Sequence, residues 1–149
     1  MFTHGAPRTS TDATSIGLLV LRLAVGGFLL PHGLGKLFGW FGGPGLAGFA
    51  AELQQFGLPS AAPLPLLLAA LQTALGLMVV AGAFTRIAAV GAAAFLAVTV
   101  ALNLSHGWFW MHGGIEYPML WLLAHVAIAL TGPGTLSIDA ARRGSAHGH

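Results

Sequence analysis

The sequence contains no cysteine and very few charged residues. Without cysteine this chain cannot form disulfides, thiol-based catalytic sites, cysteine-ligated iron–sulfur clusters or thiolate metal sites. Charged residues make up 7% of the 149 positions, whereas an average soluble domain has about 25%. So few charges cannot cover a water-facing surface, which excludes an ordinary soluble domain. The hydrophobic share of 56% also excludes intrinsic disorder, which requires low hydrophobicity.

The few charged residues are widely separated along the chain. Uncharged stretches separate Glu52 from Arg86, Arg86 from Glu116, and Glu116 from Asp139. Each of these stretches is longer than the roughly 20 apolar residues that a helix needs to cross a membrane. Together with a mean hydropathy of +0.81, this spacing predicts an integral membrane protein in contact with the lipid bilayer.

Glycine and proline divide the hydrophobic sequence into four expected spans. These are about Ser15–Leu37, Leu64–Phe84, Ile87–Leu104 and Ile115–Leu130. Between the first two, segment 46–56 repeats apolar residues at helical spacing, which predicts a short amphipathic helix that lies at the membrane interface or packs against the bundle. We therefore predict an all-α, polytopic four-transmembrane-helix bundle over residues 15–140. Polar tails over residues 1–14 and 141–149 would flank it.

The basic residues predict the orientation of this bundle. With four spans, one side carries Arg8, Arg86, Arg142 and Arg143, and the other carries only Lys36. The positive-inside rule then places both termini in the cytoplasm. Trp40, Trp108 and Trp110 would lie at the outer interface, where such rings are favoured. Because the basic residues are scattered and do not form one face, we expect no nucleic-acid partner.

Ionisable and polar residues within the spans are informative because each costs about 2.5–3.5 kcal/mol at mid-bilayer when charged. They fall into two expected layers. The candidate pocket near the outer leaflet consists of His32, Lys36, Asn103, His106, Glu116 and Tyr117. The deep polar layer consists of Arg22, Gln72 and His125, of which Gln72 is the candidate hydrogen-bond partner of the buried imidazole.

Lys36 is the central residue of the outer group. It lies four residues after His32, so both point from the same helix face. Its candidate counter-charges on that side are Glu52 and Glu116. Two interpretations follow: a polar pocket that hydrogen-bonds the carbonyl oxygens of a quinone-like head group, or a structural ion pair between Lys36 and Glu116.

Metal binding and independent catalysis find little support in the residue pattern. His32, His106 and His112 are loosely spaced and have few neighbouring carboxylates, so we expect no metal site. The sequence places neither a nucleophile beside a base nor a pair of carboxylates. Any redox role would therefore depend on a bound cofactor, with a quinone as the candidate, or on a partner subunit.

Five segments, in order along the chain, resemble the DoxX family of small membrane proteins. They are Leu21–Ala24 (LRLA), Pro31–Lys36 (PHGLGK), Gly82–Arg86 (GAFTR), Gly113–Tyr117 (GGIEY) and Gly132–Ala140 (GPGTLSIDA). The resemblance implies a four-helix inner-membrane protein. The family takes its name from a subunit linked to quinone-reducing sulfur oxidation, and other members are associated with oxidative-stress complexes. Many relatives carry a glutamate where this chain has Gln72, which puts in question any role that needs a titrating carboxylate there.

These observations lead to one functional expectation and two rivals. The leading expectation is an accessory or anchor subunit of a quinone-linked redox or oxidative-stress system, contacting a quinone or a membrane-associated redox partner protein. The first rival is a small-molecule or ion transporter, for which a homo-oligomer could supply the walls that four helices lack. The second is a structural assembly protein whose polar residues only fix the register of the helices.

Overall fold

The computed structural model of the protein describes residues 12–146, and these form helices and connecting loops without any strand. The helices are α1 (Ala13–Phe38), α2 (Gly45–Gln55), α3 (Leu64–Ala81), α4 (Thr85–Asn103), α5 (Glu116–Thr131) and α6 (Ile138–Ala146). Short 3-10 turns lie at Trp40–Gly42, Leu104–His106 and Trp110–His112. The predicted all-α fold is therefore confirmed for the described residues.

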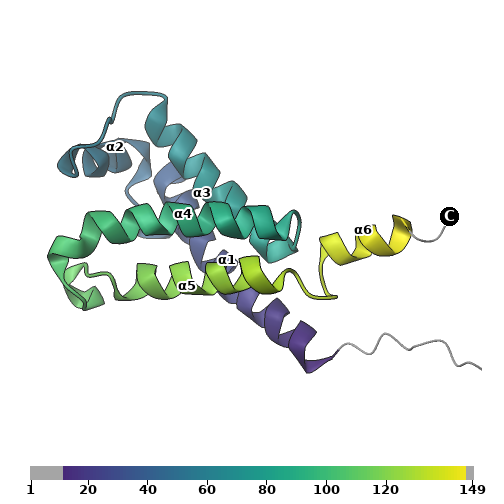
Figure 1. The fold of residues 1–149 in the computed structure, drawn as a ribbon. Coiled ribbons are helices and arrows are strands. Elements are labelled where there is room, and N and C mark those ends of the chain that lie inside the picture. The colour runs from purple at the N-terminus through teal and green to yellow at the C-terminus, as the bar shows by residue number, and fades with distance from the viewer. Residues whose placement is uncertain (1–11, 147–149) are drawn as a thin grey trace, which may run out of the picture.

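The long helices form one bundle (Figure 1). Helix α1 packs mainly against α3, and α4 runs antiparallel to α5, while α3 also contacts α4. Helix α2 rests on α1 and α3, and α6 leads away from the bundle. The buried core combines residues of α1, α3, α4 and α5: Val25, Leu29, Leu75, Val79, Ala88, Ala89, Ala92, Leu96 and Ile128.

Small residues allow α1 and α3 to approach closely. A Cβ atom placed on Gly26 would stand 3.0 Å from the carbonyl oxygen of Gly76, and one on Gly33 would stand 2.9 Å from the backbone nitrogen of Thr73. In lipid, close packing of this kind replaces the hydrophobic drive that holds helices together in water. The glycines on α1 therefore fix how near, and at which register, α3 can lie.

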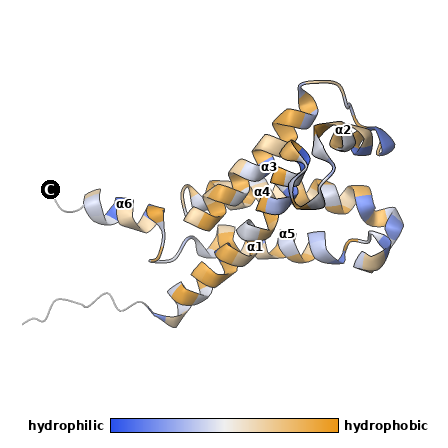
Figure 2. Ribbon diagram, turned by 180° about the vertical axis from the view of Figure 1, so that it is seen from behind, coloured by the Kyte–Doolittle hydropathy of each residue, from blue (hydrophilic) through white to orange (hydrophobic). Residues whose placement is uncertain are grey.

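Three helical segments are long and apolar enough to cross a membrane: Ala13–Phe38, Leu64–Ala81 and Thr85–His106. Helix α5 is also apolar but has 16 residues, giving a length of about 24 Å against a hydrocarbon core of about 30 Å. Hydrophobic residues run along α1, α3 and α4, and hydrophilic ones occur on α2 and in the loop between α4 and α5 (Figure 2). The fourth span stays a prediction.

Several helix ends differ from the sequence-based boundaries. Helix α1 begins at Ala13 because the Asp12 side chain accepts a hydrogen bond of 2.8 Å from the amide of Ser15, a typical N-cap. Helix α3 ends before Phe84, since Gly82 adopts a left-handed φ of 68°. Residues 141–146, expected in a polar tail, belong to α6. The other predicted tail residues, 1–11 and 147–149, lie outside the described residues.

The expected amphipathic helix over residues 46–56 is present as α2. Its buried residues Phe49 and Leu53 pack with Ala69 of α3 in a second, smaller core cluster. The amphipathic stripe therefore faces the bundle, and an interfacial position for α2 remains a prediction.

Candidate functional site

The side chain of Lys36 lies where α1, α2, α3 and α4 converge. Its Nζ donates a hydrogen bond of 3.0 Å to Oε1 of Gln72, a side chain on α3 that is only 5% exposed. The same nitrogen stands 4.4 Å from the ring centre of Phe49 and 5.4 Å from that of Phe95. Both rings are close enough for cation–π attraction, which strengthens away from water. Lys36 is thus held by one amide and two aromatic faces.

The backbone of α1 beside Lys36 packs closely against α3 and against the glycine-rich stretch before α2. Gly33 faces Thr73, the residue next to Gln72, and Gly35 faces Gly43, where an added Cβ would stand 2.4 Å from the Gly35 Cα. The close approach at Gly33 brings α1 near enough to α3 for the lysine to reach Gln72. The glycine-rich stretch before α2 is likewise seated directly on α1.

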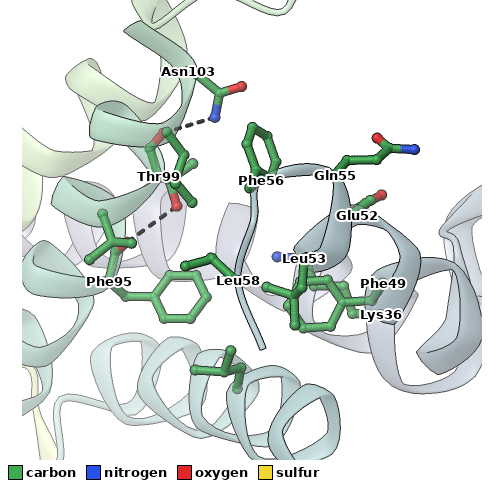
Figure 3. A pocket seen from close by; sticks show the side chains of 13 residues that line it. Lys36, Phe49, Glu52, Leu53, Gln55, Phe56, Leu58, Phe95, Thr99 and Asn103 are labelled. Carbon is green, nitrogen blue, oxygen red and sulfur yellow. Dashed lines mark hydrogen bonds between the residues drawn. The ribbon is translucent and has the colours of Figure 1, made fainter. Parts of the chain in front are cut away.

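Three cavities in the described part of the chain meet at Lys36. The first, about 440 Å³ and here called the α2–α4 cavity, lies between those two helices (Figure 3). The second, about 300 Å³ and called the aromatic cavity, is bounded by α5 residues including Tyr117 and Trp121. The third, about 380 Å³ and called the glycine-loop cavity, lies beside residues 40–44. Lys36, Phe95, Thr99 and Asn103 line both the first and the second.

Four of the six predicted pocket residues are brought together in these cavities. His32, Lys36, Asn103 and Tyr117 all line the aromatic cavity. The His32 ring meets Trp121 edge-on with ring centres 5.1 Å apart, and Tyr117 stacks on Trp121 at 6.4 Å. Asn103 donates from Nδ2 to the carbonyl of Thr99 at 2.8 Å. The aromatic cavity therefore combines flat rings with polar side chains.

The other two predicted pocket residues lie elsewhere. His106 is exposed in the loop after α4, and neither it nor Glu116 is among the residues lining the three cavities. The predicted pairing of Lys36 with Glu116 is wrong. The carboxylate of Glu116 instead accepts a hydrogen bond of 3.2 Å from the Trp110 amide. This bond links Glu116 to the loop between α4 and α5. Lys36 forms its hydrogen bond with Gln72 instead, because α1 packs on α3.

The predicted deep polar layer separates into three different environments. Gln72 belongs to the Lys36 site. His125, fully buried, is linked through Nδ1 to the Trp121 carbonyl at 2.7 Å. The expected partnership of Gln72 with His125 is therefore wrong. Because a carbonyl only accepts, Nδ1 carries the proton, and Nε2 has no hydrogen-bond partner within the described structure.

Arg22 marks the opposite end of the bundle from Lys36. It is 1% exposed, donates from Nη2 to the carbonyl of Leu136, and lies flush against Gly82. Its position holds the segment after α5 against the turn between α3 and α4. Arg22 thus joins three of the DoxX-like sequence segments at one place.

The residue pattern did not single out Asp139, which completes this contact. Its carboxylate accepts hydrogen bonds from the amides of Phe84 and Thr85, both at 2.8 Å, and from the Thr85 hydroxyl at 2.7 Å. Partial burial raises the pKa of Asp139, but the bonds from Thr85 and Phe84, with the charge of Arg143, outweigh it and hold the pKa below its usual value. Asp139 therefore caps the start of α4 from a distant part of the chain.

Glu52, one of the two candidate counter-charges of Lys36, lines two of the three cavities with it and attracts it electrostatically. Three further residues of the Lys36 site were not predicted. Phe49 and Leu53 belong to the apolar stripe of segment 46–56, which predicted a helix and no site. Phe95 had no distinguishing local signal. Among the described residues, no group of three His, Cys, Asp or Glu side chains is placed to hold a metal ion.

Comparison with known proteins identifies the family. The DoxX family model matches residues 17–113, from α1 to the loop before α5. No curated protein and no solved structure matches the chain. The matched segment contains His32, Lys36, Gln72 and Asn103, so the residues around the lysine lie within it. With its membrane-capable helices, the chain belongs to the DoxX family of membrane proteins.

Proposed function

We propose that this DoxX-family protein is a membrane accessory subunit of a quinone-linked redox or oxidative-stress system and that Lys36 binds the head group of a quinone. The observation that carries the proposal is the position of the Lys36 ammonium at the meeting point of three cavities. Its bond to Gln72 uses one of three N–H donors. The remaining donors are available for a carbonyl oxygen.

The surroundings of Lys36 suit a flat, weakly polar ring. The lining of the aromatic cavity combines the rings of Tyr117 and Trp121 with the polar side chains of Lys36, Gln72 and Asn103. Aromatic faces favour stacking of a planar ring, and a charged donor makes a stronger hydrogen bond to a carbonyl than a neutral one does. In this proposal Gln72 positions the lysine, and electron transfer depends on a partner redox protein.

The proposal places the site near the outer leaflet of a bacterial-type inner membrane, with α5 as the fourth span. Helix α5 packs along α4, and its first amide, that of Glu116, donates to the Trp108 carbonyl in the loop that joins the two helices. Helix α5 ends beside the start of α4, where a Cβ on Gly132 would stand 3.3 Å from Arg86. This return along α4 supports a fourth crossing and a cytoplasmic end carrying Arg86 and α6.

Lys36→Met should weaken quinone binding by about tenfold or more, because removal of a charged hydrogen-bond donor costs roughly 1.5–3 kcal/mol. Methionine preserves the apolar stem, so the fold should persist. The wild-type protein, purified in mild detergent, would be extracted with solvent and analysed for quinone, and a decyl-tailed benzoquinone would be titrated into each variant.

His106→Ala is the matched control, since this exposed histidine lies outside the cavities, and its binding should equal that of wild type. The proposal fails if no quinone co-purifies and the added quinone neither binds nor shifts the thermal midpoint. A stoichiometric protein partner without any quinone would instead support an assembly role.

A further inference from the structure

The α2–α4 cavity differs from the aromatic cavity in the chemistry of its walls. Two facing helix stripes supply most of its lining. Helix α4 contributes Phe95, Val98 and Leu102, and α2 with the residues after it contributes Phe49, Leu53, Phe56 and Leu58. The α4 residues follow helical spacing, as do Phe49 and Leu53, whereas Phe56 and Leu58 come after the end of α2 at Gln55. The result is a mainly apolar space, here called the channel, whose lining includes Lys36 (Figure 3).

The apolar channel is open toward the lipid-facing surface. Val98 is 56% exposed and Phe56 is 39% exposed, although both line the cavity. Val98 lies on the membrane-capable helix α4, so its exposed side faces hydrocarbon, and this wall of the channel borders the lipid. Water is a poor occupant of such a space because an apolar cavity offers it few hydrogen bonds.

The channel also borders the aromatic cavity. Lys36, Phe95, Thr99 and Asn103 line both cavities, so the lysine adjoins both spaces. A ligand whose ring binds Lys36 therefore has an apolar space beside it, between α2 and α4, for a hydrocarbon tail.

Resting on the proposed function, we infer that the α2–α4 cavity holds the hydrocarbon tail of the quinone whose head group Lys36 binds. The protein then selects long-tailed, lipid-soluble quinones taken directly from the bilayer. Lys36 supplies the attraction for the head group, and the α2 and α4 stripes supply the selection by tail length.

The inference is tested by filling the channel from the lipid side. Val98→Trp in the full-length protein should weaken binding of a decyl-tailed benzoquinone by about tenfold, because a bulky ring would occupy the space that the tail needs. Binding of the same benzoquinone ring without a tail should not change. The matched control is Val90→Trp on the same helix, 59% exposed and outside the three cavities, which should alter neither affinity.

Each result separates the inference from the proposed function. Equal affinity of wild type for tailed and tail-less rings, with Lys36-dependent binding retained, would overturn the tail site alone. Loss of co-purified phospholipid in Val98→Trp with unchanged quinone binding would also overturn it and assign the channel to a lipid acyl chain. If neither the tailed nor the tail-less benzoquinone binds, the proposed function itself is contradicted. If Val98→Trp lowers the thermal midpoint relative to Val90→Trp, Val98→Phe repeats the measurement with less bulk.

Discussion

Gly33→Ala is expected to destabilise the protein by about 2 kcal/mol, as insertion of a methyl group into a tightly packed site does. The added Cβ would stand 2.3 Å from the Thr73 Oγ1, 2.9 Å from its backbone nitrogen and 3.1 Å from its Cα. The hydroxyl could rotate away, but the backbone atoms move only if α3 moves. We therefore expect a lower thermal midpoint in detergent, measured by tryptophan fluorescence.

The same substitution should also weaken quinone binding. Displacement of α3 from α1 would lengthen the hydrogen bond between Lys36 and Gln72, which is 3.0 Å in the structure, and would leave the ammonium less well positioned. Equilibrium titration with the decyl-tailed benzoquinone, below the midpoint of the variant, measures this effect.

Gly27→Ala provides the control within the same helix. A Cβ at Gly27 meets nothing within 4 Å, and alanine favours the helix over glycine by about 1 kcal/mol. This variant should therefore be as stable as wild type or slightly more so. Equal midpoints for the Gly33 and Gly27 variants would contradict the close approach of α1 and α3.

Asp139→Ala is expected to lower the stability of the protein by about 2 kcal/mol, since an unsatisfied buried donor costs roughly 1–3 kcal/mol. The substitution removes the acceptor of three hydrogen bonds at the start of α4. Thr85, which donates two of them, is fully buried, so water cannot easily replace the carboxylate. Chemical or thermal unfolding at neutral pH measures the loss.

The contribution of Asp139 should also depend on pH. Its pKa is held below the usual value, which is near 4, so the folded state favours the ionised form. The stabilisation is complete above about pH 4 and is lost as the pH falls through the lowered pKa. The difference in stability between wild type and Asp139→Ala should therefore shrink under acid conditions.

Asp12→Ala is the comparison variant for this effect. Asp12 also caps a helix, where its carboxylate accepts a hydrogen bond from the Ser15 amide, but its side chain is exposed. Its removal should cost less than removal of Asp139. An equal or smaller loss for Asp139→Ala would contradict the role of Asp139 as the anchor between α6 and the α3–α4 turn.

The candidate site could be predicted only in part from the sequence. The spacing of His32 and Lys36 correctly placed both on one face of α1, and both line the aromatic cavity together with Asn103 and Tyr117. Opposite charge predicted Glu52 and Glu116 as candidate counter-charges of Lys36, with an ion pair to Glu116 as one interpretation. The partner is Gln72, because the glycine contacts of α1 bring α3 closest to the lysine.

Asp139 shows a second limit of inference from local patterns. Its position early in a short polar segment suggests an ordinary surface residue. It reaches Phe84 and Thr85 only because residues 132–137 turn back toward the bundle, where Arg22 holds the Leu136 carbonyl. No spacing within residues 132–140 reveals a partner more than 50 positions earlier.

The order of the amino acids is sufficient for the membrane class, the helical fold and the approximate ends of the helices. Scarce charge, long apolar stretches and glycine or proline breaks act locally, through the cost of placing polar groups and free backbone amides in hydrocarbon. Only the packed bundle decides the partner of Lys36, the cavities around it and the anchoring of α6. Those features depend on how each helix is rotated about its axis. In lipid, where an apolar helix can present any side to hydrocarbon, close contacts such as Gly33 with Thr73 set that rotation.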